Sequence, residues 1–160
     1  QPGRYMQHHD LIWTEILETG MHRMPFSIDA KFNIVDLADL AEATALVLTG
    51  DSHDFASYQL AGPDSLSQLD MARIISEVIG KPVFAETKST DEFKQSAEKV
   101  GMPADRIEQL ILMNKHYNEH GLVGNSNVLE WILGRPATNF STYIRNNLAQ
   151  DNVNQDFTNL

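Results

Sequence analysis

Two groups of histidines are the residues whose spacing first suggests chemistry. His116, Glu119 and His120 fit the pattern His-x-x-Glu-His, in which two imidazoles on one helix face bind zinc and the glutamate acts as a base. A catalytic zinc site needs a third protein ligand, and the acidic residues further along the chain are Glu130, Asp151 and Asp156. Gly121 ends the segment, and the helix dipole also favours histidine in a last helical turn. We favour that electrostatic role over zinc and expect no bound metal.

Two other polar groups have simple structural explanations. Adjacent His8 and His9 point to different sides of a helix, so they cannot chelate together, and we expect them at the surface or along a pocket. Asp36 and Asp39 stand where a helical pattern begins. Capping and stabilisation of the helix dipole account for these two aspartates better than a catalytic carboxylate pair does.

Motifs for nucleotide binding and proton transfer are missing from the chain. Of its nine glycines, only Gly121 and Gly124 lie close together, and no predicted strand leads into them, so there is no dinucleotide-binding loop. A phosphate-cradling lysine motif and a Gly-x-Ser-x-Gly elbow are also missing. The Tyr-x-x-x-Lys pair of short-chain dehydrogenases is absent, because the residues four positions after the tyrosines are His9, Gly62, Gly121 and Asn147. The catalytic residues stay unassigned.

Composition narrows the class of partner. The 160 residues carry 22 acidic and 12 basic side chains, for a net charge of −10, which argues against binding to nucleic acid or to an anionic membrane surface. No apolar run approaches the ~20 residues of a membrane span, and the first residues do not resemble a signal peptide. The chain has no cysteine, which removes disulfides and thiolate catalysis. We expect a cytoplasmic protein with one domain.

Periodicity and capping residues predict an alternation of short strands and helices, typical of an α/β protein. The expected helices cover residues 5–19, 37–49, 66–80, 91–100, 104–120, 128–133 and 141–148. The expected strands cover 24–28, 31–35, 58–61 and 83–86. We expect Trp13 and Trp131 to be core or inter-helix anchors. Four short strands do not form a complete sheet, so we expect the chain to be a piece of a longer protein whose sheet is centred upstream.

Three stretches occur in an informative order. The first is Gln-Pro-Gly-Arg-Tyr-Met-Gln at 1–7, the second is the Val-Asp-x-x-Asp-x-Ala step within 33–41, and the third joins Gly-Leu-Val-Gly at 121–124 to Leu-Gly-Arg-Pro at 133–136. Together they resemble the NmrA-like family, atypical NAD(P)-binding members of the short-chain dehydrogenase superfamily. In that family the first stretch follows a late strand of the sheet, and arginine is the commoner residue at the position of Gln1.

The resemblance implies a fold, and it implies that substrate and cofactor are bound mainly by different halves of the protein. Residues 1–148 would be the C-terminal, substrate-side portion of a Rossmann-like NmrA-type fold, with few short strands and a mainly helical region, while 149–160 would form a flexible tail. NADP or NAD would be bound mainly by an upstream half that carries the Gly-rich loop. The residues implied beside the cofactor are Pro2, Gly3 and Tyr5. The residues implied around the substrate pocket are Tyr5, Met6, Trp13 and Phe26.

Two functions are compatible with this resemblance. The first is an NAD(P)H-dependent oxidoreductase acting on a small aromatic or quinone-like substrate. The second is a non-catalytic NAD(P)-sensing protein that binds a protein partner. An independent α/β domain without cofactor is a third interpretation, which we rank below both. The chain alone is expected to be inactive, since it lacks the phosphate-binding loop, and to form a homodimer if the edge of its sheet needs covering.

Overall fold

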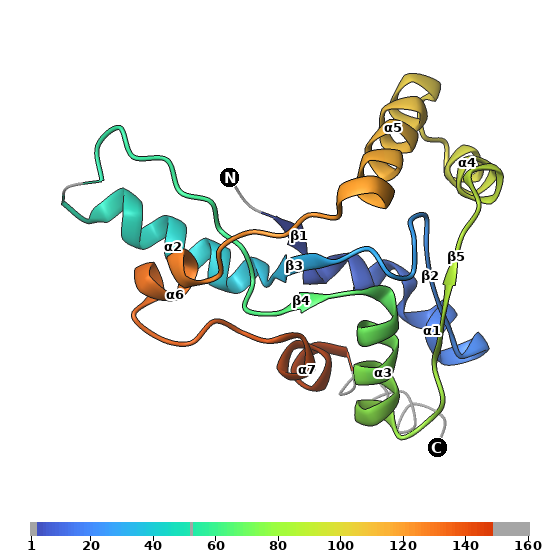
Figure 1. Ribbon diagram of the computed structural model, residues 1–160, viewed down its shortest axis with the longest axis horizontal. Helices are drawn as coiled ribbons and strands as arrows, with labels where there is room; N and C mark the ends of the chain where they lie inside the picture. The colour runs from blue at the N-terminus through green and yellow to red at the C-terminus, as the bar shows by residue number, and fades with distance from the viewer. Residues whose placement is uncertain (1–2, 52, 149–160) are drawn as a thin grey trace, which may run out of the picture.

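The chain folds into two small sheets surrounded by helices in the computed structural model, which describes residues 3–51 and 53–148 (Figure 1). The strands are β1 (Arg4–Tyr5), β2 (Met21–Met24), β3 (Phe32–Val35), β4 (Ser65–Leu66) and β5 (Phe84–Thr87). The α-helices are α1 (Trp13–Thr19), α2 (Leu37–Thr49), α3 (Gln68–Ile79), α4 (Thr90–Lys99), α5 (Ala104–His120), α6 (Asn127–Leu133) and α7 (Phe140–Tyr143). A 3-10 helix, η1 (Met6–Ile12), precedes α1, and a π-helical turn, η2 (Ile144–Leu148), follows α7. The expected α/β class is confirmed.

The larger sheet places β3 in its centre. Its strand order is β1-β3-β4, with β1 parallel and β4 antiparallel to β3. The other sheet is the parallel pair β2-β5. All four residues of β3 are buried, as expected for a strand that is covered on both faces. In Figure 1, β3 runs through the middle of the molecule, with α2 and α6 towards one end and α4 and α5 towards the other.

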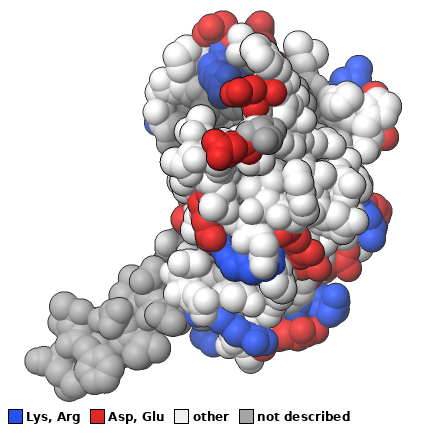
Figure 2. Space-filling model, turned by 90° about the vertical axis from the view of Figure 1, so that its left-hand side faces the viewer, with Lys and Arg blue, Asp and Glu red and all other residues white. Residues whose placement is uncertain are grey.

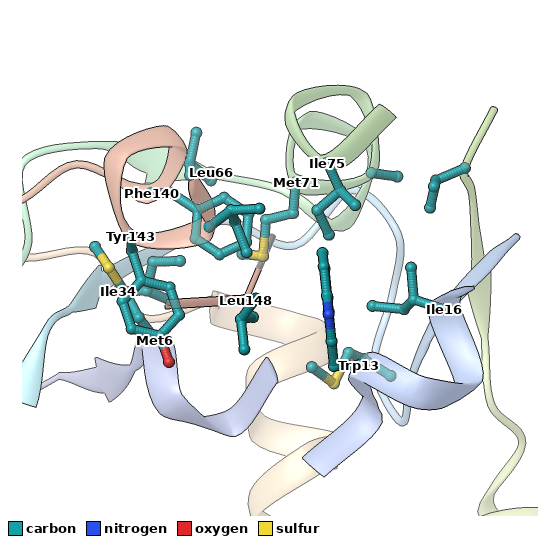
Figure 3. Packing of buried hydrophobic residues seen from close by; sticks show 14 of the residues in the cluster. Met6, Trp13, Ile16, Ile34, Leu66, Met71, Ile75, Phe140, Tyr143 and Leu148 are labelled. Atoms are coloured by element: carbon teal, nitrogen blue, oxygen red, sulfur yellow. The ribbon is translucent and has the colours of Figure 1, made fainter. Parts of the chain in front are cut away.

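The side chains of β3 alternate between two hydrophobic clusters, as the two-residue period of a strand requires. Phe32 and Ile34 belong to the larger cluster, which the helices α1, α3 and α7 help to build (Figure 3). Val35 belongs to a smaller cluster between α2 and α6. The buried members of that smaller cluster are Val35, Ala43, Leu60, Leu129 and Leu133. The central strand therefore separates two differently packed sides of the molecule.

Many helix boundaries follow the capping residues of the sequence. Asp36 accepts a hydrogen bond from the backbone of Ala38 at the start of α2, 3.0 Å long. Ser67 and Asp70 form a reciprocal capping box at the start of α3. Gly20, Gly80 and Gly134 end their helices in the left-handed conformation, which glycine adopts without steric cost. The helix at 104–120 begins and ends where we expect it.

The first expected helix differs from its prediction. Only Trp13–Thr19 is α-helical, because Arg4 and Tyr5 pair with β3 and the next seven residues form a 3-10 helix. The strand expected at 24–28 lies earlier, at Met21–Met24, where it pairs in register with β5. The segment 58–61 forms no strand, although Leu60 accepts a 3.1 Å backbone hydrogen bond from Gly3. Pairing with distant segments overrides local propensity at the first two of these places.

The two tryptophans have different environments. Trp13 is 6% exposed and packs in the larger cluster, which confirms the expectation of a core anchor. The same expectation is wrong for Trp131, which is 68% exposed. Leu129 and Leu133 lie one helical turn apart and face the smaller cluster. Trp131, two positions from each, therefore points away from that cluster.

Gly62 allows the chain to pass directly against β3. An ideal Cβ at this position would lie 1.7 Å from the carbonyl oxygen of Ile34, so that any side chain would collide with the backbone. Because the two backbones lie so close, the Asn33 side-chain amide also donates a hydrogen bond to the Gly62 carbonyl oxygen at 2.9 Å.

Within the described residues, no helix is both long and apolar enough to cross a membrane. Gln1, Pro2 and the expected tail at 149–160 lie outside the described residues.

Candidate functional site

The carboxyl ends of β1 and β3 meet at one edge of the sheet, because the two strands are parallel. Open α/β sheets bind their ligands at this edge. There the Gln7 amide donates to the Asp36 carboxylate at 2.7 Å and accepts from the backbone of Leu37 at 3.2 Å. The Tyr5 ring is half-buried and stacks on His8, with ring centroids 5.7 Å apart. This edge therefore combines one accessible aromatic ring with an ordered amide–carboxylate pair.

The residues implied for the substrate pocket pack in the interior of the molecule. Met6 and Phe26 are each 1% exposed and Trp13 is 6% exposed, and all three belong to the larger hydrophobic cluster (Figure 3). Tyr5 packs instead against the smaller cluster. The structure thus brings three of the four residues together as core residues, and a contact with substrate stays a prediction for all four.

A small cavity lies at Gly3. Its volume is about 180 Å³, which is below the usual range of ligand pockets and would admit only a ring-sized group. The cavity is lined by Gly3, Asn33, Gln59, Leu60, Ala61, Leu122, Val123 and Gly124. The Asn33 side chain, 4% exposed, accepts from the backbone of Gly124 at 3.1 Å and so ties this loop to β3.

Arg4 is the most unusual polar residue near this edge. Its side chain lies on the same face of the sheet as Ile34, which is its partner in β3, and its guanidinium rests on two aromatic rings. The guanidinium carbon is 4.6 Å from the centre of the Phe26 ring and 5.3 Å from that of Phe32. One nitrogen lies 3.9 Å from the Met24 sulfur. Burial lowers the pKa of Arg4 to about 10, so the group keeps its charge at neutral pH.

A pair of buried histidines lies close to Arg4. The rings of His9 and His22 stack with centroids 5.3 Å apart, and the two side chains are 1% and 0% exposed. Burial, followed by the charge of Arg4, lowers the pKa of His22 to about 4. Burial, followed by the neighbouring His22, lowers the pKa of His9 well below its usual value. Both rings are therefore neutral at pH 7, and Arg4 carries the charge of this group.

The hydrogen bonds of the two histidines are incomplete. The Nδ1 atom of His9 lies 2.9 Å from the carbonyl oxygen of Met6, which places the proton on that nitrogen. The other ring nitrogen of His9 and both ring nitrogens of His22 are buried and have no hydrogen-bond partner among the residues that the structure describes. Unpaired buried polar atoms are uncommon and call for an explanation. The expectation that His9 lies at the surface is therefore wrong, because its ring is enclosed by His22 and Phe140. A role of His9 along a pocket stays a prediction.

The His-x-x-Glu-His segment occupies the last turns of α5. His116 and His120 share a helix face as their spacing predicts, with ring centroids 4.7 Å apart. The His120 side chain is 60% exposed and lies 3.7 Å from the Glu119 carboxylate. Throughout residues 3–51 and 53–148, no three histidine, aspartate or glutamate side chains are grouped closely enough to hold a metal ion. Asp151 and Asp156 lie outside this part of the chain.

Asp36 and Asp39 have separate roles. Asp36 caps α2, as predicted. Asp39 is 1% exposed and accepts hydrogen bonds from the Arg135 guanidinium at 2.7 Å and from the backbone of Thr138 at 2.5 Å. Arg135 also pairs with Glu42 on the next turn of the helix. This pairing fastens α2 to the segment after α6, a role that the order of the motifs does not reveal.

The sequence of the chain is similar to those of known reductases. It is 29% identical to the NAD(P)H azoreductase of Xenophilus azovorans over 93% of the chain and 52% of that protein. It is 27% identical to quinone oxidoreductase 2 of Escherichia coli over 69% of the chain and 38% of that protein. The chain thus spans about half, or less, of these curated relatives. No family model matches the sequence.

Solved structures show the same relationship. One match is the NADPH complex of the NADPH-dependent quinone oxidoreductase of Escherichia coli, with a TM-score of 0.78 and 24% identity. This match covers 90% of the chain and 50% of the oxidoreductase chain. A second structure of the same enzyme matches at 25% identity. The fold is that of the C-terminal part of an NAD(P)-binding reductase. The triphenylmethane reductase of Citrobacter sp., complexed with NADP(H), also matches at a TM-score of 0.78 over 92% of the chain, with 23% identity.

Proposed function

We propose that the chain is the substrate-side portion of an NAD(P)H-dependent oxidoreductase of the NmrA-like family, which reduces a small quinone-like or aromatic acceptor. The observation that carries this proposal is the match of 90% of the chain to half of a quinone oxidoreductase in complex with NADPH. The azoreductase relative covers nearly the same extent of the chain and supports the same class of acceptor.

The cavity at Gly3, beside the amino end of β1, fits the nicotinamide end of a dinucleotide. Gly3 lines this cavity, and an ideal Cβ there would lie 2.8 Å from the Asn33 carbonyl oxygen, so a side chain at this position would force the backbone to shift. A cavity of about 180 Å³ suits a ring rather than a whole cofactor. The phosphates would be held outside this chain, because it carries no Gly-rich phosphate loop. When bound, NADP or NAD supplies a hydride.

Each implied residue then has a definable task. Pro2 and Gly3 would pass close to the cofactor ring, and the half-buried Tyr5 would present its face to the cofactor and acceptor. Met6 and Phe26 would form the apolar wall that keeps water from the reacting atoms, with Trp13 behind them. A dry, aromatic wall favours planar acceptors.

The test is NAD(P)H oxidation by the full-length protein that contains this chain, measured by absorbance with and without quinone acceptors. We expect quinone-dependent oxidation, and no turnover by the 160 residues alone. In the full-length protein, Tyr5→Ala should raise KM for the quinone about tenfold, as the loss of one aromatic contact predicts. Leu11→Ala, at a residue that is 84% exposed, is the matched control and should change nothing.

Two outcomes would contradict the proposal. Tight NADPH binding without turnover of any quinone or azo acceptor would favour the sensing function instead. Micromolar NADPH binding by the 160-residue chain would show that its nucleotide site lies within these residues.

A further inference from the structure

Arg4 carries a charge that the described part of the chain does not neutralise. Other arginines have carboxylate partners: Arg23 pairs with Glu86 and Glu92, and Arg73 pairs with Glu77. Across residues 3–51 and 53–148, the single polar contact of the Arg4 guanidinium is the Met24 sulfur, which is a weak acceptor. A buried charge is normally paired, because removing it from water without a partner is costly.

The surroundings of Arg4 offset only part of this cost. The faces of Phe26 and Phe32 attract the guanidinium by cation–π interactions. The five N–H groups at the edges of the guanidinium have no oxygen acceptor within the part of the chain that the structure describes. Arg4 as a whole residue is half-buried. Aromatic rings therefore contact the guanidinium plane, while the described residues offer its N–H groups only the Met24 sulfur.

The neighbouring side chains favour a negatively charged, aromatic ligand. Tyr117, on α5, packs edge-on against the rings of Phe26 and Phe32, with centroids 6.3 Å and 5.4 Å away. His22, which is neutral at pH 7, has a ring N–H without an acceptor. The His22 ring is 0% exposed and is enclosed, whereas the rings of Phe26 and Phe32 lie against the guanidinium itself, so an oxyanion attached to an aromatic ring would complement the charge of Arg4 and these rings.

We propose that Arg4 binds the phenolate oxygen that forms on a quinone-like acceptor when the acceptor takes up a hydride. This inference rests on the proposed function. When NAD(P)H is bound, its C–H bond would break as the hydride forms an O–H bond with one quinone oxygen; the electron pair makes the ring aromatic, and the π pair of the other C=O bond moves onto its oxygen, which gives the hydroquinone monoanion. A proton from water then completes the hydroquinone. Arg4 stabilises the negative oxygen before that proton arrives, because its guanidinium keeps its charge at neutral pH.

The probe is 4-nitrophenol, whose phenolate absorbs visible light and needs no cofactor. Titrated with the 160-residue chain, it should bind as the phenolate, so the pKa of the bound phenol should fall below that of the free phenol. Arg4→Met should weaken phenolate binding about tenfold or more and remove this pKa shift. Arg106→Met is the matched control, since it deletes the same charge from an exposed position on α5.

Two further measurements keep the test decisive. The neutral ether 4-nitroanisole should bind weakly and equally to the wild type and to Arg4→Met, because it presents no oxyanion. If Arg4→Met loses the near-ultraviolet circular dichroism of the native chain, Arg4→Lys replaces it. Lysine keeps the charge and loses the planar fork, so we expect a reduced but measurable pKa shift.

The outcomes separate this inference from the proposed function. Unchanged phenolate binding by Arg4→Met, no binding by the wild type, or an equal loss in Arg106→Met would overturn the role of Arg4, whatever the full-length protein does with quinones. Absence of quinone turnover in the full-length protein, together with Arg4-dependent phenolate binding, would leave a phenolate site and remove the reductase from which it was inferred.

Discussion

Arg4 and Arg135 lie on opposite sides of the central strand and have opposite environments. Arg135 pairs with the buried Asp39 and with Glu42, and hydrogen bonds to these two carboxylates raise its pKa. Arg4 has aromatic rings and a sulfur as neighbours, and burial lowers its pKa. Figure 2 views the molecule from the α2 and α6 end, where the blue basic groups lie beside red acidic ones. A paired arginine joins two parts of the fold, whereas an unpaired one is available to a ligand.

The largest expected effect is a loss of folding stability at low pH, which arises at His22 on the Arg4 side of the molecule. The folded-state pKa of His22 is about 4 and its ordinary value is 6.5, so the unfolded chain binds a proton that the native chain refuses. Stability is therefore fully present above about pH 6.5 and is lost as the pH falls towards about 4, by roughly 3 kcal/mol in total. The measurement is the free energy of unfolding in urea at several pH values across this window.

Two variants assign this pH dependence. His22→Phe keeps an aromatic ring against His9 and should reduce the slope, while His9, whose pKa is also lowered by burial, still contributes to it. His120→Phe removes a histidine whose side chain is 60% exposed and should leave the slope as it is. Equal slopes in the wild type and His22→Phe would show that His22 does not govern acid stability.

The next effect belongs to the Arg135 side. Asp39→Ala should lower the free energy of unfolding by about 2 kcal/mol, because it leaves the Thr138 N–H and the Arg135 guanidinium without their shared acceptor. Glu42→Ala removes the exposed partner of the same arginine and should cost less. Urea unfolding measures both. An equal loss in the two variants would mean that burial of Asp39 adds nothing to the pairing.

The smallest effect on stability is expected at Arg4. Arg4→Met replaces an unpaired charge by an apolar chain of similar length, so the free energy of unfolding should change by less than about 1 kcal/mol or should rise. The same urea titrations supply the measurement. A loss as large as that of Asp39→Ala would give Arg4 a structural role and would erase the contrast between the two arginines.

The sequence predicts much of the helical framework, because its signals are local. Asp36, Ser67 and the terminal glycines act within a few residues of themselves, so α2, α3 and α5 form close to where they are expected. The order of the three motifs predicts the fold class. The 3-10 helix and the position of β2 are not predictable this way, because each depends on pairing with a distant strand.

The candidate site is less visible in the sequence for the same reason. Arg4 meets Phe26 and Phe32, and His9 meets His22, only after segments far apart in the chain have packed. A single arginine in the Gln-Pro-Gly-Arg-Tyr stretch gives no sign that a carboxylate partner will be missing. The missing partner is a property of the folded chain, since it depends on where each acidic residue of the described ranges, 3–51 and 53–148, lies after folding.

The two tryptophans give each side of the molecule an optical label of its own. Trp13 is enclosed in the larger cluster, while Trp131 is exposed and tilts against Tyr58, which packs on the smaller one. An indole in an apolar core emits at shorter wavelength than one in water and is shielded from iodide, so the native emission should contain a blue, protected component and a red, quenchable one. Chains that keep one tryptophan at a time would report the opening of the Arg4 side and of the Arg135 side as separate fluorescence signals.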